Sequence, residues 1–118
     1  MAQSGGDVKP RPLRESDIEK RLVQRVKEMG GEVRKVKWIG RSGAPDRLVM
    51  LATHVTVAHR AHRGPEIIDV EGVTIWVELK APGAKPEPHQ LREHARMRKM
   101  GQQVEVVDSY ERVEDILK

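Results

Sequence analysis

The chain has 118 residues, a net charge of +4 and no cysteine. This length allows one domain, because single cores usually span about 100 to 150 residues. Its content of 37% hydrophobic and 34% charged residues is compatible with a folded soluble domain. The lack of cysteine excludes disulfide bonds, thiolate nucleophiles and cysteine-ligated metal sites. We expect a flexible N-terminal tail at residues 1–12, which contains glycines and prolines, and a single domain at residues 13–118.

The sequence predicts neither a membrane span nor a secretory signal. The longest uncharged apolar stretches, 48–52 and 73–77, are far shorter than the roughly 20 residues of a bilayer-spanning helix. Residues 1–12 contain no apolar core of the kind found in signal peptides. We therefore expect a cytoplasmic protein with no membrane partner.

Basic residues outnumber acidic ones by 22 to 18, and they are concentrated in segments 11–37 and 92–99. Such segments can contact a phosphate backbone. A charge run is more often the solvated outer face of a helix, so two helices would explain the pattern equally well. Charge alone leaves nucleic acid open as a partner without establishing it.

The first predicted element is a helix over residues 16–29. Its apolar residues recur at spacings of four, four and three and form one stripe: Ile18, Leu22, Val26 and Met29. Ser16 with Glu19 three residues later matches a capping box, and the glycines at 30–31 end the helix. We therefore expect the stripe to face the core of the domain.

Two strands are predicted to follow this helix. Residues 33–39 alternate in the manner of a strand, and a glycine-bearing turn at 40–43 comes next. Residues 48–51 form an apolar run that is too short for a helix and indicates a central strand buried on both faces. Segment 53–72 has a looser pattern, which favours an elaborated hairpin or flap with turns at 60–65 and 71–72.

The C-terminal half predicts a strand, a crossover helix, a second strand and a final helix. Residues 73–80 form the strongest strand of the sequence, and Gly101 caps a helix over 86–100. A short strand at 103–107 and a helix at 109–117, opened by Asp108 or Ser109, complete the chain. The crossover implies one parallel pair beside antiparallel strands. We therefore predict an α/β fold with a mixed central sheet covered by helices.

Three residues of this arrangement can form a catalytic site. Glu78 and Lys80 point to the same face at the end of a strand, because side chains alternate with period two. If Asp46 lies on the adjacent strand, two carboxylates and a lysine converge, a set that suits Mg²⁺ or Mn²⁺ and phosphodiester chemistry. Each residue also has an ordinary explanation: Asp46 suits a turn, Glu78 and Lys80 suit a surface salt bridge. Glu19 is a candidate third carboxylate, although a capping box explains it equally well.

The ordered set of motifs resembles the VRR-NUC (virus-type replication-repair nuclease) branch of the PD-(D/E)xK nucleases. The resemblance runs from about Ile18 to Asp108. It rests on Glu19 in the first helix, the Gly-Ala-Pro-Asp-Arg segment at 43–47, the Val-Glu-Leu-Lys segment at 77–80, Gln90 in the next helix and Gly101 before the last strand. Its specificity comes from the order and spacing of the set, because each element alone is common.

The resemblance implies a restriction-endonuclease-like core and a DNA endonuclease that depends on Mg²⁺ or Mn²⁺. It assigns the site residues as follows: Asp46, Glu78, the backbone carbonyl of Leu79 and Glu19 as metal ligands, Lys80 as a catalytic residue, and Gln90 as the residue that completes the motif. Stand-alone members resemble one another in being small homodimeric, structure-selective DNA nucleases, many of them from phages, and they include ones that cut four-way junctions. The resemblance therefore implies branched DNA and a second copy as partners, in a bacterial or phage-infected host cell.

The remaining candidate residues are DNA contacts and histidines. Four basic residues near Asp46 are expected to contact phosphates: Lys35, Lys37, Arg41 and Arg47. The spacing of the three histidines in segment 53–72 matches no common metal motif, so we expect them to be solvated. For His89 and His94, packing or a surface position is favoured over a role in catalysis, and Trp38 and Trp76 are expected in the core, although Trp38 could reach a base.

Two alternative functions remain open at this stage. A non-catalytic basic module that binds nucleic acid would bind DNA without cutting it in any divalent metal. A restriction-type or nicking endonuclease with the same core would cut linear duplex DNA into discrete fragments, but the sequence contains no recognition domain for this.

Overall fold

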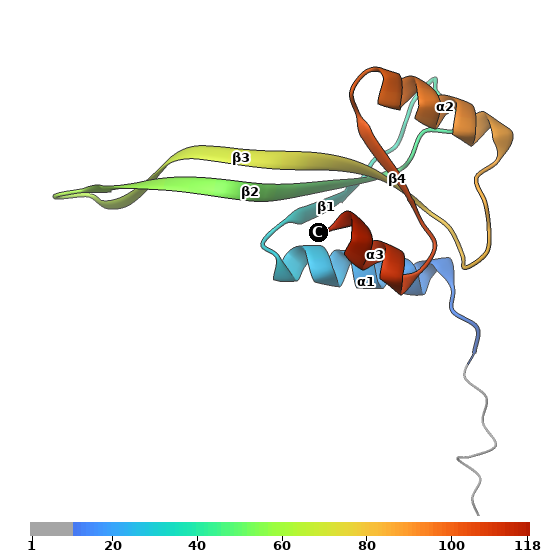
Figure 1. Ribbon diagram of the computed structural model, residues 1–118, viewed down its shortest axis with the longest axis horizontal. Coiled ribbons are helices and arrows are strands. Elements are labelled where there is room, and N and C mark those ends of the chain that lie inside the picture. Colours follow the sequence, from blue (N-terminus) through green and yellow to red (C-terminus); the bar gives the residue numbers. More distant parts are fainter. Residues whose placement is uncertain (1–10) are drawn as a thin grey trace, which may run out of the picture.

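The computed structural model describes residues 11–118, so most of the predicted N-terminal tail lies outside the described residues. The elements, in chain order, are α1 (Glu15–Glu28), β1 (Glu32–Lys35), β2 (Arg47–Arg60), β3 (Gly64–Leu79), α2 (Pro88–Lys99), β4 (Gln103–Val107) and α3 (Tyr110–Ile116) (Figure 1). The strands form one sheet in the order β1-β2-β3-β4, antiparallel except for the parallel pair β3 and β4. The predicted α/β fold with a mixed sheet is confirmed.

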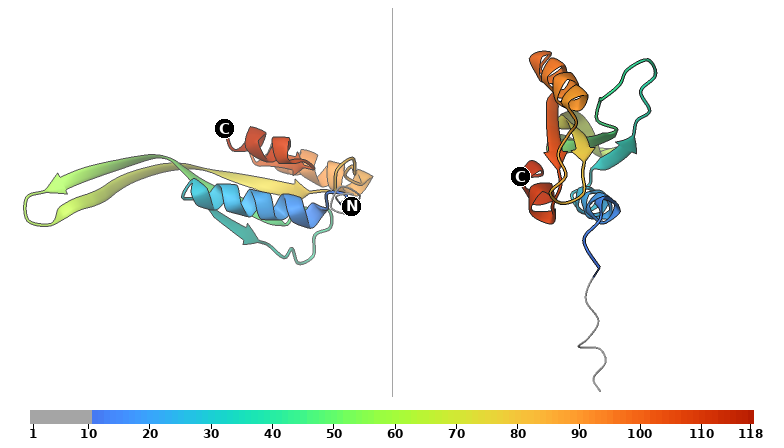
Figure 2. Two further views of the ribbon diagram at one scale, coloured as in Figure 1. Left: turned by 90° about the horizontal axis from the view of Figure 1, so that it is seen from below. Right: turned by 90° about the vertical axis from the view of Figure 1, so that its right-hand side faces the viewer.

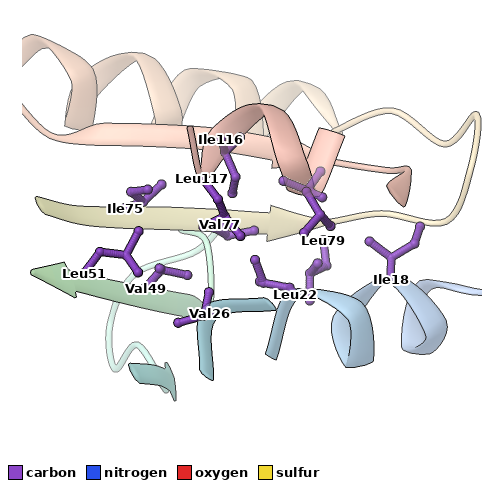
Figure 3. Close-up of a cluster of buried hydrophobic side chains, with 12 residues drawn as sticks. Ile18, Leu22, Val26, Val49, Leu51, Ile75, Val77, Leu79, Ile116 and Leu117 are labelled. Carbon is purple, nitrogen blue, oxygen red and sulfur yellow. The ribbon is translucent and has the colours of Figure 1, made fainter. Parts of the chain in front are cut away.

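The main core lies on the face of the sheet that packs against α1 and α3 (Figure 3). Residues 75, 77 and 79 of β3 are buried in this core together with Ile18 and Leu22 of α1. The residues between them on β3 point to the opposite face, because successive strand residues alternate. That opposite face carries α2, as the contacts of Glu78 with His94 show. The predicted apolar stripe of the first helix is therefore the core face of α1 as far as Val26, whereas Met29 is the C-cap and is 43% exposed.

The start of α1 differs from the prediction. The helix begins at Glu15, so Ser16 lies inside the first turn and cannot be its cap. Arg14 is the extended residue before the helix, and its N–H donates to the carboxylate of Asp17 at 2.9 Å. The predicted pairing of Ser16 with Glu19 is wrong, because a cap must have extended backbone and Arg14 has it instead.

The first strand is shorter than the prediction of residues 33–39. β1 ends at Lys35, and residues 36–46 form a loop. Trp38 leaves the line of the strand and packs on Trp76, with ring centroids 5.1 Å apart. Ile39 is 91% exposed, so its place in an alternating pattern did not mark a buried face. At residues 36–39, the packing of Trp38 on Trp76 thus takes the place of strand pairing.

β2 and β3 continue beyond the other strands as a two-stranded hairpin, residues 53–72, which we call the arm (Figures 1 and 2). The chain reverses between Arg60 and Gly64, which confirms the predicted hairpin and its turn at 60–65. The turn predicted at 71–72 is wrong, because both residues belong to β3 and face Ala52 and His54 across a shift in register. A Cβ on Gly72 would lie 2.7 Å from the carbonyl oxygen of Leu51, so this close approach explains the glycine.

The C-terminal elements agree with the sequence. α2 lies within the predicted 86–100, and Gly101 follows it with φ +83, a conformation that favours glycine. β4 occupies the predicted residues, and the hydroxyl of Ser109 caps α3 by accepting from the N–H of Arg112 at 3.0 Å. Within residues 11–118, no helix is both long and apolar enough to cross a membrane.

Candidate active site

Asp46 and Glu78 face each other across the pair β2 and β3. Arg47 is the partner of Val77 in this antiparallel register, so Asp46 lies opposite Glu78 at the next position along both strands. Directly opposed residues in a sheet have Cβ atoms roughly 4.5 to 5.5 Å apart. The fold therefore brings together two carboxylates that are 32 positions apart in the sequence.

The Glu78 carboxyl is buried beside these charges. Its side chain is 11% exposed. Burial raises the pKa of Glu78 to about 7; the nearby Lys80 ammonium opposes this rise, whereas the charges of Asp46 and Glu15 add to it. A carboxyl with such a pKa is poised to lose its proton when a cation arrives.

His94 is the closest partner of Glu78 on α2. Its Nε2 lies 3.3 Å from Glu78 Oε1, and its ring is fully buried. Burial, with the charges of Arg98 and Lys80, lowers the pKa of His94, so the ring is neutral near pH 7. A neutral ring with hydrogen on Nε2 donates to the carboxylate and fixes its orientation.

Lys80 is held on the same face by the start of α2. Its Nζ donates to Gln90 Oε1 at 2.9 Å, and this oxygen also accepts the backbone N–H of Glu87 at 2.8 Å. Gln90 therefore has two functions: it stabilises the first turn of α2 and it positions the lysine. The loop before β2 packs on this same turn, because a Cβ on Gly43 would lie 2.8 Å from the carbonyl oxygen of His89.

Glu19 is connected to the pair of Asp46 and Glu78 only through Arg47. The carboxylate of Glu19 is bonded to the Arg47 guanidinium, which also binds Asp46 Oδ1 at 2.9 Å. Among residues 11–118, no three acidic or histidine side chains are arranged to hold a metal ion. The geometry thus places Glu19 in a position to orient Asp46 through Arg47, and it does not bring Glu19 together with Asp46 and Glu78 as a third ligand.

The predicted DNA contacts divide into two groups. Lys35 and Lys37 are exposed, and Arg41 is exposed although it pairs with Glu93 at 3.3 Å. Arg47 is only 8% exposed and is occupied by two carboxylates. The prediction that Arg47 contacts a phosphate is therefore corrected: its guanidinium is buried in the support of the site. The three histidines of the arm are exposed, as predicted.

Sequence reasoning missed Glu15 and underrated His94. Glu15 is the first residue of α1, and its charge contributes to the raised pKa of Glu78. Glu15 is exposed, but it lies three residues before Ile18 and so on the same side of the helix as the buried stripe; a carboxylate at this spacing is the signal that could have found it. His94 is buried as packing would require, but its contact with Glu78 also gives it a place in the site.

Comparisons with known proteins identify the family of the chain. No family model matches the sequence. The chain is 46% identical over 99 residues to p44, named as a candidate nuclease, of Acyrthosiphon pisum secondary endosymbiont phage 1, an alignment that covers 84% of this chain and 87% of that protein. A solved structure described as a VRR_NUC domain shares 40% identity and a TM-score of 0.66, and the match covers 89% of this chain and 95% of the other. The fold, the motifs and these two relatives together show that the chain belongs to the VRR-NUC family of nucleases.

Proposed function

We propose that the chain is a divalent-metal-dependent DNA endonuclease that hydrolyses phosphodiester bonds at Asp46 and Glu78. The observation that carries this proposal is the register of β2 and β3, which sets these two carboxylates opposite each other. Lys80 lies on the same face as Glu78, held by Gln90. Two carboxylates and a positioned ammonium are the groups that a metal-assisted hydrolysis requires.

The donor set suits a hard cation such as Mg²⁺ or Mn²⁺. Asp46, Glu78 and the backbone carbonyl of Leu79 would hold it, since all three offer oxygen. The raised pKa of Glu78 supports this choice, because a buried carboxyl beside another carboxylate needs a cation to ionise fully. When bound, the ion neutralises charge on the phosphoryl oxygens and lowers the pKa of a bound water.

The surrounding residues keep the reacting groups in place. His94 orients Glu78 from α2, and Arg47, braced by Glu19, orients Asp46. Lys80 approaches the phosphate and stabilises the negative charge that develops on it. Gln90 acts as a positioning residue because its side-chain oxygen holds Lys80.

Branched or distorted DNA is the proposed substrate class. The exposed lysines at 35 and 37 supply phosphate contacts that do not depend on base sequence. Selectivity for DNA geometry, as in four-way junctions or flaps, follows from such a surface.

We assign the dimer interface of this enzyme to the arm. A two-stranded hairpin is marginally stable by itself in water, and this one exposes a face with Val55, Val57, Ile67 and Val70. A second copy would cover this face with an identical one, as two-fold symmetry allows. The pairing would place two active sites in one particle, which suits cleavage of both strands at a junction.

Cleavage of labelled DNA tests the proposal. Four-way junction, flap, single-stranded and linear duplex DNA are incubated with wild type or Asp46→Asn in Mg²⁺, Mn²⁺ or EDTA. We expect metal-dependent cutting of the branched substrates that the variant loses. Binding without cutting in every metal would instead support the non-catalytic module, and discrete fragments from long linear duplex would support the restriction-type enzyme.

A further inference from the structure

A cavity lies on the same face of the sheet as Glu78. It occupies about 560 Å³ between the 36–46 loop, β3 and the C-terminal end of α2. Its walls are apolar and polarisable: Trp38, Trp76, Met97 and Met100. Figure 2 (right) shows the loop and α2 side by side at one end of the sheet. This volume is in the range of pockets that bind small ligands.

The rim of this cavity is basic. Arg41, Arg96 and Lys99 surround the opening, with Glu93 as the single carboxylate. Glu93 is buried and binds Arg96 at 2.9 Å and Arg41 at 3.3 Å, so it ties both guanidinium groups to the edge. The rim therefore keeps a net positive charge around an apolar floor. An occupant with a flat apolar body and an attached anion fits both parts.

Two direct links connect the cavity to the active site. Trp76 precedes Glu78 by two positions on β3, so both point to the same face roughly 7 Å apart along the strand. The indole N–H of Trp38 donates to the carbonyl oxygen of Pro45 at 2.8 Å, and Pro45 directly precedes Asp46. A ligand in the cavity is thus within about one nucleotide of the carboxylate pair.

We propose that this cavity accepts one unpaired nucleobase of the DNA next to the phosphate that is cut. The inference rests on the proposed function, because it takes DNA as the substrate. Every base has a flat π face that stacks on indole and contacts methionine sulfur, so the cavity accepts bases without regard to sequence. The rim cations then bind the phosphate of that nucleotide. In an intact duplex all bases are stacked and paired, so only distorted DNA can fill the cavity at low cost.

Intrinsic fluorescence reports on the cavity directly, because its walls contain both tryptophans of the chain. Wild type in EDTA is titrated with a blunt duplex and with the same duplex carrying one unpaired thymine. We expect the bulged DNA to quench the emission at least threefold more than the blunt duplex at saturation. Equal quenching by the two duplexes, or none by either, would overturn the proposal.

Two methionines provide a matched pair of variants. Met100 and Met29 each occupy the C-cap of a helix, of α2 and α1 respectively, but only Met100 lines the cavity. Met100→Glu places a negative charge at the opening, and we expect it to weaken binding of the bulged duplex about tenfold. Met29→Glu adds the same charge elsewhere and should change the affinity less than twofold. Equal losses in the two variants would show a general charge effect and overturn the proposal.

Cleavage assays on the same preparations separate this proposal from the proposed function. Selective quenching without any metal-dependent cutting would sustain the base cavity and reject the nuclease assignment. Cutting without selective quenching would sustain the nuclease assignment and reject the base cavity. A change in emission with protein concentration, without DNA, would assign the cavity to a contact with a second copy and overturn the proposal.

Discussion

The two faces of the sheet serve different purposes, and β3 shows the contrast within two residues. Val77 points to α1 and α3 and is fully buried among aliphatic side chains. Glu78, the next residue, points to α2 and contacts His94. One face thus holds the apolar core, with the pair of Arg47 and Glu19 at its edge, whereas the other carries Glu78, Lys80 and the indoles. Substitutions on the two faces should separate stability from activity.

The largest expected effect is the loss of cleavage in Glu78→Gln. The amide keeps the shape of the side chain but cannot serve as an anionic ligand, so we expect cleavage to fall more than about 100-fold, beyond the usual effect of an outer-shell partner. Circular dichroism should show an unchanged fold. Cleavage within a factor of about three of wild type, in the labelled-junction assay, would contradict the place of Glu78 in the site.

A smaller loss is expected for Gln90→Ala. This change removes the oxygen that holds both Lys80 Nζ and the Glu87 N–H. We expect cleavage to fall about 10- to 100-fold, as when other supporting residues are removed. Gln103→Ala, an exposed amide on β4, is the control and should leave cleavage and stability unchanged. An equal loss in both variants would argue against a specific role for Gln90.

On the core face, Val77→Ala should change stability and leave the chemistry intact. Removing two buried methyl groups lowers the free energy of unfolding by about 2 kcal/mol, from lost burial plus a small cavity. Urea denaturation measures this loss, and the cleavage rate under folded conditions should remain within about twofold of wild type. A strong loss of cleavage in the fully folded variant would show that the two faces are coupled.

The contrast between the apolar face and the opposite face of the sheet also decides how much of the structure the sequence could predict. The core of α1 followed from periodicity, because burial of one face imposes a repeat on the residues. The parallel pair followed from the crossover helix between two strands. Asp46, Glu78, Lys80 and Gln90 followed from a known order of motifs. The position of Glu15 could not be separated from that of Glu19, because both carboxylates lie near the buried stripe and only the fold shows which one Arg47 binds.

Long-range packing explains the other differences. The burial of Arg47 depends on α1 and the loop before β2 meeting in space, and no local pattern records this. In the arm, Glu71 and Gly72 continue the strand. Gly72 indicates a turn by its residue type, but the structure requires a glycine there for the close approach to Leu51. The loop that carries Trp38 left its strand because of a contact with Trp76, 38 positions away in the sequence.

A substitution in the arm should change dimerisation and leave the stability of the core unchanged. Ile67 lies on the exposed apolar face of the arm, so Ile67→Lys should shift the particle mass from dimer to monomer in sedimentation at micromolar concentration. Unfolding of the core should change by less than about 0.5 kcal/mol, as for other exposed substitutions. Thr56→Lys, on the opposite face of the arm, is the control. A monomeric wild type would contradict the assigned interface.

The pH dependence of the free energy of unfolding tests how much stability is lost when the buried Glu78 carboxyl is ionised. Its pKa is raised from an ordinary value of 4.5 to about 7, so between these values the folded chain keeps a proton that the unfolded chain has released. The free energy of unfolding therefore falls as pH rises from about 4.5 to about 7 and is then level. Glu78→Gln has no such proton to lose.

We therefore expect metal-free wild type to lose, relative to Glu78→Gln, on the order of 2 kcal/mol of stability between pH 5 and pH 8. Urea denaturation in EDTA at the two pH values measures this difference. Mg²⁺ or Mn²⁺ should restore stability to wild type at pH 8 but not to the variant, because only an ionised Glu78 binds the cation. Parallel pH profiles for the two proteins would mean that the Glu78 carboxyl is already ionised without a metal, and that the burial of this face is not what prepares the site to bind one.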